Sequence, residues 1–80
     1  MANVTIYTTP TCVYCKMTKN FFLEHNIQYT EKNVVEDTGA REQMIQKSGQ
    51  MGVPVTDIDG QIVVGFDQER LSELLGVKVS

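Results

Sequence analysis

The segment Cys12-Val13-Tyr14-Cys15 constrains the fold of this chain more than any other feature of its sequence. Its two cysteines are the only ones among 80 residues, and thiols at this spacing can close and reopen a small disulfide ring. The pair follows the apolar, β-branched run at residues 4–8 and precedes a segment with helical spacing. A C-x-x-C pair at such a strand-to-helix turn predicts thiol–disulfide exchange chemistry.

Length and composition bound the remaining possibilities. Eighty residues with 41% hydrophobic side chains predict a single globular domain over residues 1–80. No apolar run approaches the about 20 residues of a membrane span, and residues 1–4 lack the basic start of a secretory signal, so we expect a cytoplasmic protein. A net charge of −3 without a basic stripe disfavours nucleic acid as a partner, and no feature demands more than a monomer.

The first half of the chain has a strand–helix–strand pattern. Residues 4–8 predict a buried strand. Residues 13–24 have helical spacing, with Met17 and Phe21 four apart on one face. Alternation over residues 27–34 predicts a second strand, and the helical connection makes the two strands parallel.

The second half predicts a helix, a β-hairpin and a last helix. Residues 37–38 can cap the middle helix, and the Asp-Gly pair at residues 59–60 is a strong hairpin signal. Asp67 can cap the last helix, which Gly76 ends. The expected fold is therefore α/β, in the order β-α-β-α-β-β-α, with a four-stranded mixed sheet flanked by three helices. The hairpin strands are expected at residues 55–58 and 61–64, and the inward-facing residues of the last two helices are expected to be Ala40, Met44, Ile45, Leu71, Leu74 and Leu75.

Cys12 occupies the expected N-cap of the first helix. There its thiolate can accept hydrogen bonds from the backbone N–H groups of Tyr14 and Cys15, and the helix dipole favours its negative charge. Both effects lower the pKa of the Cys12 thiol, and the thiolate is the nucleophile in disulfide exchange. Cys15 lies about one turn into the helix, where we expect an inward side chain. This placement predicts that Cys12 attacks a substrate disulfide and that Cys15 then releases the reduced substrate.

Other interpretations of the same residue types are weaker. A permanent structural disulfide, or two unrelated core thiols, would have no reason to sit at a strand–helix turn. A closed zinc site needs about four ligands, whereas the chain adds only His25, at the far end of the helix, so we expect no metal site. His25 fits a surface position at a helix C-terminus, and Met17, Met44 and Met51 fit core positions.

Two further segments are candidate binding sites. Val53-Pro54 opens a strand, and a cis bond there would let the Val53 backbone pair with an extended substrate, whereas a trans bond would make an ordinary turn. Gly65-Phe66-Asp67 precedes the last helix, where backbone N–H groups can bind a carboxylate and Asp67 can accept from an ammonium. A plain strand–helix turn with an N-cap explains the same three residues equally well.

These motifs occur in the order seen in a known family. The sequence is Ile-Tyr-Thr-Thr-Pro-Thr-Cys-Val-Tyr-Cys over residues 6–15, Gly-Val-Pro-Val over residues 52–55 and Gly-Phe-Asp over residues 65–67. It resembles the glutaredoxins of the thioredoxin superfamily over essentially the whole chain. The resemblance is greatest to the short bacterial glutaredoxin-like proteins and the related NrdH-type redoxins, and it implies a thioredoxin fold.

The resemblance also implies a site and partners. It makes Cys12 the nucleophile and Cys15 the resolving thiol, joined in the oxidised state by a Cys12–Cys15 disulfide, with a cis Pro54. It implies glutathione as co-substrate, no metal or tightly bound organic cofactor, and disulfide-containing proteins as substrates. The residues it places around the substrate and glutathione groove are Thr9, Tyr14, Val53, Pro54, Gly65, Phe66 and Asp67.

Three positions depart from the glutaredoxin pattern. Val13 replaces a frequent proline between the cysteines, and Thr9 replaces a basic residue that meets the glycyl carboxylate of glutathione. Val64-Gly65 replaces paired glycines before the last helix. One alternative is therefore an NrdH-type redoxin reduced by thioredoxin reductase. Another is a non-enzymatic binding module or cluster carrier that uses the same thiols as ligands.

Overall fold

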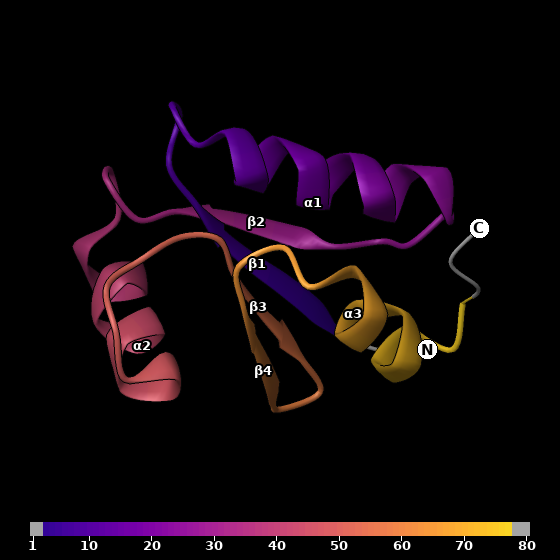
Figure 1. Ribbon diagram of the computed structural model, residues 1–80. Coiled ribbons are helices and arrows are strands. Elements are labelled where there is room, and N and C mark those ends of the chain that lie inside the picture. Colours follow the sequence, from indigo (N-terminus) through magenta and orange to yellow (C-terminus); the bar gives the residue numbers. More distant parts are fainter. Residues whose placement is uncertain (1–2, 78–80) are drawn as a thin grey trace.

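The computed structural model describes residues 3–77 and contains the elements in the predicted order (Figure 1). The order β-α-β-α-β-β-α is thereby confirmed. The bounds are β1 Val4–Thr8, α1 Val13–Glu24, β2 Thr30–Asn33, α2 Thr38–Ser48, β3 Val55–Ile58, β4 Gln61–Val64 and α3 Gln68–Leu75.

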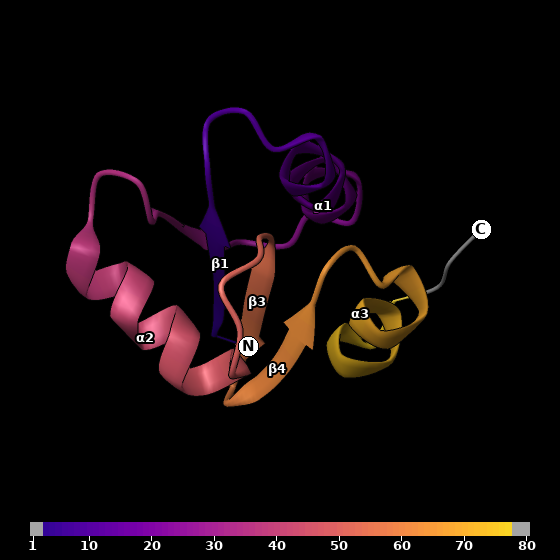
Figure 2. The ribbon, with the colours of Figure 1, turned by 60° about the vertical axis from the view of Figure 1, so that its left-hand side comes forward.

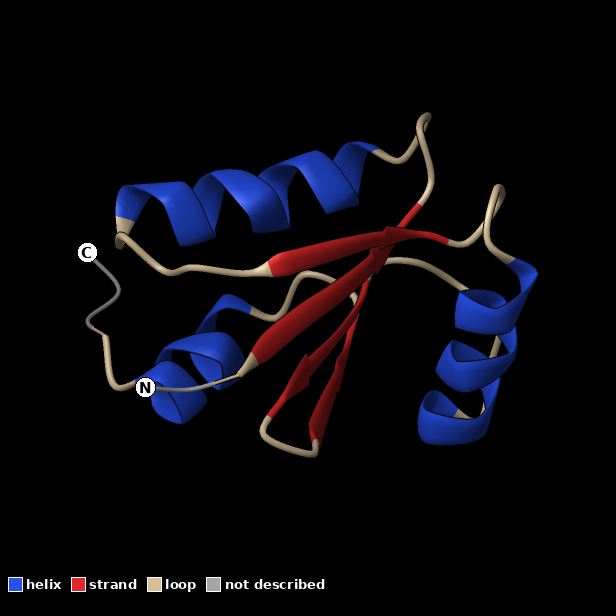
Figure 3. Cartoon of the chain, turned by 180° about the vertical axis from the view of Figure 1, so that it is seen from behind, coloured by secondary structure: helices blue, strands red, loops and turns tan. Residues whose placement is uncertain are grey.

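The four strands form one mixed sheet in the order β2-β1-β3-β4. β1 pairs with β2 in parallel and with β3 antiparallel, so β1 lies at the centre of the sheet beside the strand that follows the Val53–Pro54 segment. The β3–β4 hairpin projects at one end of the sheet (Figure 3). Its turn residues Asp59 and Gly60 have φ values of 50° and 91°, the left-handed geometry that an Asp-Gly hairpin turn requires.

Helices cover both faces of the sheet, with α1 and α3 on one side and α2 on the other (Figure 2). Strand alternation explains why two separate cores form. Ile6 of β1 faces α1 and α3 and packs with Phe22 and Leu71, whereas its neighbour Tyr7 faces α2 and packs with Met44. The end of β1, from which the loop to α1 starts, is therefore packed on both faces of the sheet.

The strand predicted at residues 27–34 is shorter in the structure, where β2 covers only Thr30–Asn33. Residues 27–29 instead close the end of α1, with the Ile27 N–H donating to the Phe22 carbonyl at 2.8 Å. The first paired residue of β2 is Thr30, which lies opposite Thr5 of β1. The hydrogen bond that closes α1 at Ile27 thus takes precedence over the alternating pattern of the sequence.

The methionine prediction is confirmed at one position and wrong at two. Met44 is buried at 1% exposure, but Met17 is 42% and Met51 is 58% exposed. The inner face of α1 is formed by Cys15, Thr18, Phe21 and Phe22 instead. Met17 lies outside that face, although it is four residues from Phe21.

The caps of α2 and α3 are residues that the sequence predicts as caps. Asp37 caps α2, its carboxylate accepting from the Ala40 N–H at 3.0 Å, so Asp37 rather than Thr38 is the N-cap. Asp67 caps α3 in the same way, and Gly76 ends that helix at φ 68° as predicted. The two capping hydrogen bonds determine where α2 and α3 begin.

An ion pair joins α2 to the sheet on the face away from the cysteines. Lys47 Nζ lies 2.6 Å from Asp57 Oδ2 and also donates to the Tyr7 hydroxyl at 3.4 Å. Burial raises the pKa of Asp57, but the hydrogen bonds from Lys47 and from the Gly60 backbone outweigh it, so the net shift is downward from 3.8. The bond to Asp57 raises the pKa of Lys47.

We expect Asp57→Asn to lower the free energy of unfolding by up to about 1 kcal/mol at neutral pH. A depressed folded pKa contributes stability above the unfolded value, which is lost as pH falls through the folded pKa. The difference between variant and wild type should therefore shrink in acid, as the pH falls through the folded pKa of Asp57. Urea unfolding at neutral and at acid pH measures the difference. A difference that persisted in acid would show that packing, not charge, carries the effect.

Candidate active site

The two cysteines meet at the start of α1, as the sequence predicts. Their sulfur atoms lie at disulfide-bonding distance, with Cα atoms 5.2 Å apart. Cys12 is the N-cap residue, with extended backbone angles of φ −85° and ψ 114°, and its Sγ accepts a hydrogen bond from the Cys15 N–H at 3.0 Å. That N–H is one of the two backbone donors expected from the sequence, and it fixes Sγ over the positive end of the helix.

Burial differs between the two sulfur-bearing residues. Cys12 is half-buried, whereas Cys15, on the inner face of α1, is only 1% exposed. Val13 and Tyr14 between them are 67% and 61% exposed, so they surround the accessible cysteine with apolar surface. Thr9 is half-buried in the loop before the helix, and its carbonyl accepts from the Cys12 N–H at 3.4 Å. An incoming disulfide can therefore reach Cys12 but not Cys15.

The structure brings the Val53-Pro54 segment to the same end of the sheet. The Val53–Pro54 peptide bond is cis, as the resemblance implies. Val55 follows it directly and pairs with Tyr7, two residues before Thr9. Val53 is half-buried and Pro54 is buried.

Gly65 is joined to the Val53-Pro54 segment by a backbone hydrogen bond. Its N–H donates to the Pro54 carbonyl at 2.8 Å, although the two residues come from different strand ends. Gly65 has φ 78°, in the left-handed region, so another residue type would strain the backbone there. Two of the predicted groove segments are thus neighbours in space.

Phe66 and Asp67 have structural tasks in this conformation. The Phe66 ring packs edge-on against Phe21 of α1, with centroids 6.2 Å apart. Asp67 is exposed, and its Oδ1 accepts from the Arg70 N–H at 3.1 Å as the N-cap of α3. The capping bond occupies one carboxylate oxygen, Oδ1.

A polar cluster near the cysteines has no counterpart in the sequence-based prediction. The Thr8 hydroxyl and Lys19 Nζ both donate to Glu31 Oε2, at 2.7 and 3.0 Å. The Thr8 bond, and then the Lys19 bond, lower the pKa of the Glu31 carboxyl below its ordinary value. The cluster ties β1, β2 and α1 together one turn beyond Cys15. The residues are 12 to 23 positions apart, so no local motif reveals them.

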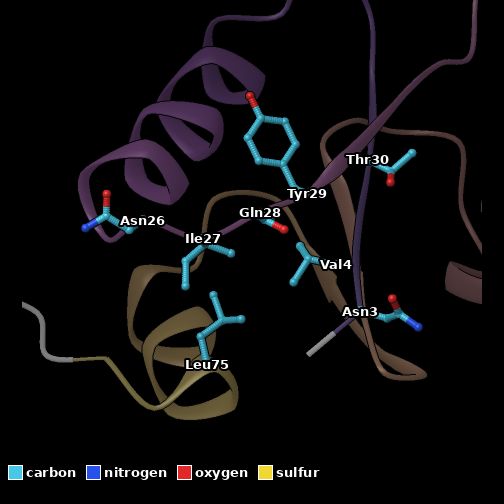
Figure 4. A pocket seen from close by; sticks show the side chains of 8 residues that line it. All are labelled: Asn3, Val4, Asn26, Ile27, Gln28, Tyr29, Thr30 and Leu75. Atoms are coloured by element: carbon cyan, nitrogen blue, oxygen red, sulfur yellow. The ribbon is translucent and has the colours of Figure 1, made fainter. Parts of the chain in front are cut away.

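Other sites offer little chemistry. Among residues 3–77 no group of three or more His, Cys, Asp or Glu side chains could hold a metal ion. A cavity of about 500 Å³ lies between the ends of α1 and α3 and the start of β1, where Asn3, Asn26, Gln28 and Leu75 line it (Figure 4). Its lining has no charged or thiol side chain, and none of the predicted site residues contributes to it.

His25 packs against Phe21, with ring centroids 4.6 Å apart, far along the helix from Cys12.

A helix-capping Cys-x-x-Cys disulfide and a cis proline at the same end of a four-stranded mixed sheet define a thioredoxin-fold redox protein. The crystal structure of a glutaredoxin from Archaeoglobus fulgidus superposes on this fold with a TM-score of 0.85 at 28% identity. The match covers 94% of this chain and 87% of that one, and it confirms the thioredoxin-like fold. Within the described range, no helix has the length and apolar character that a bilayer crossing requires.

The sequence comparisons are more specific. The glutaredoxin family model matches residues 4–63, so the chain belongs to the glutaredoxin family. A glutaredoxin-like 8.6 kDa protein from the rubredoxin operon of Clostridium pasteurianum is 44% identical over 72 residues, 90% of this chain and 96% of that protein. The glutaredoxin-like protein NrdH of Lactococcus lactis is 34% identical over 71 residues, 89% of this chain and 97% of that protein. The chain is therefore a glutaredoxin-like redox protein of the thiol–disulfide oxidoreductase class.

Proposed function

We propose that this protein is a dithiol oxidoreductase that reduces protein disulfides and glutathione mixed disulfides through Cys12 and Cys15. The observation that carries the proposal is the asymmetry of the pair. Cys12 is accessible and accepts a backbone N–H at a helix start, whereas Cys15 is buried within bonding distance behind it. One sulfur is thus suited to attack a substrate and the other to resolve the product.

The exchange has two steps. The Cys12 thiolate attacks one sulfur of the substrate disulfide, forming a mixed disulfide and expelling the other sulfur as a thiolate that takes a proton from solvent. The Cys15 thiolate then attacks Cys12 Sγ, the Cys12–Cys15 bond forms, and the second substrate sulfur leaves. Two electrons pass to the substrate, and the protein needs an external reductant for the next cycle.

We propose glutathione as that reductant. The backbone around Val53, the turn at Gly65 and the start of α3 lie at the cysteine end of the sheet, joined by the Pro54–Gly65 hydrogen bond. This arrangement supports a groove in which a tripeptide pairs with the Val53 backbone. Its γ-glutamyl end would meet the Phe66 N–H and the free oxygen of Asp67. Tyr14 would cover the reacting sulfurs.

Thioredoxin reductase is the second candidate, and the residue at position 9 favours it. Thr9 is uncharged, so the groove lacks a cation for the glycyl carboxylate at that point. The NrdH relative from Lactococcus lactis supports the same alternative. In that case the protein would accept electrons from a reductase rather than from a small thiol.

Turnover with two reductant systems tests the proposal. One assay contains glutathione with glutathione reductase, the other thioredoxin reductase, and both follow NADPH consumption with a disulfide substrate. We expect turnover with glutathione. Thr9→Lys should raise that rate about three- to fivefold, because the lysine ammonium would pair with the glycyl carboxylate of glutathione. Thr9→Gln is the matched uncharged control and should stay at the wild-type rate. Turnover with thioredoxin reductase alone would instead assign the second candidate.

A further inference from the structure

The side chain of Thr56 is an unpaired polar group inside the core. It is 0% exposed, and its Oγ1 has no hydrogen-bond partner among the described residues. A hydroxyl buried without a partner destabilises the fold, and strands can place valine there at no such cost. An unpaired hydroxyl of this kind therefore suggests a partner that is present in another state of the protein.

Thr56 lies on the α1-facing side of the sheet. It pairs with Ile6 on β1 and with Val63 on β4, and both of these belong to the core beneath α1 and α3. Because strand residues directly opposite each other share a face, the Thr56 side chain points into the same layer. Asp57, the next residue, points the other way and meets Lys47 of α2.

Cys15 faces this layer from α1, near the end of the sheet at which β3 begins. It belongs to the buried row of α1 with Thr18 and Phe22. At 1.5 Å per residue, Cys15 lies about 10 Å along the axis of α1 from Phe22, in the first turn of the helix. The helix starts from the end of β1 at which that strand leaves the sheet (Figure 1). β3 begins beside that end of β1, with Thr56 as its second residue.

The neighbouring polar groups already have partners. The Thr18 hydroxyl donates to the Tyr14 carbonyl at 2.8 Å, and the Thr8 hydroxyl donates to Glu31. Glu31 is in turn paired with Lys19. Among the described residues, Thr56 Oγ1 is the buried side-chain polar atom without a hydrogen-bond partner, so its hydroxyl is free to donate to the Cys15 sulfur.

We propose that Thr56 donates a hydrogen bond to the Cys15 sulfur when the Cys12–Cys15 disulfide is open. A disulfide sulfur is a poor acceptor, whereas the Cys15 thiolate is a strong one that is cut off from water. Thr56 keeps its own proton while Cys15 Sγ forms the bond to Cys12 and the substrate sulfur leaves. The residue thus positions and stabilises the resolving thiolate, which deepens the proposed function and rests on it.

The redox equilibrium of the Cys12–Cys15 pair in dithiothreitol buffers tests this role without substrate turnover. In Thr56→Val, the equilibrium constant for reduction should fall about fivefold, because the reduced form loses a hydrogen bond and the oxidised form loses an unpaired hydroxyl. Thr56→Ser, the matched control, should stay within about twofold of wild type. In rapid mixing, resolution of the mixed disulfide should slow about tenfold in Thr56→Val while the attack by Cys12 keeps its rate.

An unchanged equilibrium and an unchanged resolution rate in Thr56→Val would overturn the role of Thr56. Thr56→Ala provides the same comparison if the valine variant does not fold, as judged by circular dichroism of the oxidised form. A wild-type protein that titrates normally but reduces no substrate disulfide would contradict the proposed function and leave the Thr56 comparison valid. The two failures are therefore distinguishable.

Discussion

Cys12→Ser is expected to abolish the reduction of disulfides with either reductant. The Cys12 sulfur is the accessible member of the pair, and a serine hydroxyl neither ionises near neutral pH nor forms a disulfide. Cys15 cannot take over the attack, because it is 1% exposed and lies on the buried face of α1. The measurement is NADPH-coupled reduction of a protein disulfide by variant and wild type at equal concentration.

Cys15→Ser is the matched control for this loss. It keeps Cys12 Sγ, so it should still attack substrates and release glutathione from mixed disulfides, but it should fail to resolve protein mixed disulfides. Wild-type reduction of protein disulfides by Cys12→Ser would contradict the assignment of the nucleophile. Oxidised wild type and both variants should have the same fold by circular dichroism.

Phe22→Ala is expected to lower the free energy of unfolding by about 3–5 kcal/mol. Phe22 is 0% exposed, its ring lies 5.3 Å from the Tyr29 ring, and it packs in the core between α1 and the sheet. A chain of this size is stable by only about 4–12 kcal/mol in total, so the substitution removes a large share. Urea unfolding followed by circular dichroism gives the value.

Leu23→Ala is the matched control on the same helix. Leu23 is 63% exposed, so its truncation should change stability by less than about 0.5 kcal/mol. A small effect at Phe22, or equal effects at the two positions, would contradict the described packing of α1.

Local chemistry made the element order predictable. Asp37, Asp67 and the Asp59-Gly60 turn act within a few residues, and each has the conformation that its type favours. The Cys12 cap belongs to the same class, since its bond to the Cys15 N–H spans one helical turn. These positions could be located because cause and effect are close in the sequence.

The features of the site that could not be predicted from the sequence depend mainly on contacts between distant segments of the chain. Thr8 and Glu31 are 23 positions apart, and the Pro54 carbonyl meets the Gly65 N–H across the β3–β4 hairpin. The strand expected from residue 27 was shortened because helix closure competes with sheet pairing there. Thr56 is a polar residue within a strand of the sheet, which the sequence alone can indicate. That its hydroxyl is buried without a hydrogen-bond partner is seen only in the structure.

Trapping of the mixed disulfide tests the central claim most directly. Reduced Cys15→Ser protein would be mixed with a disulfide-bonded peptide, quenched by acid and mapped by mass spectrometry after digestion. The account predicts one peptide attached through a disulfide to Cys12, and complete resolution of the same adduct by the wild-type protein. The absence of an adduct at Cys12, or equal capture by Cys15 in the Cys12→Ser variant, would contradict it.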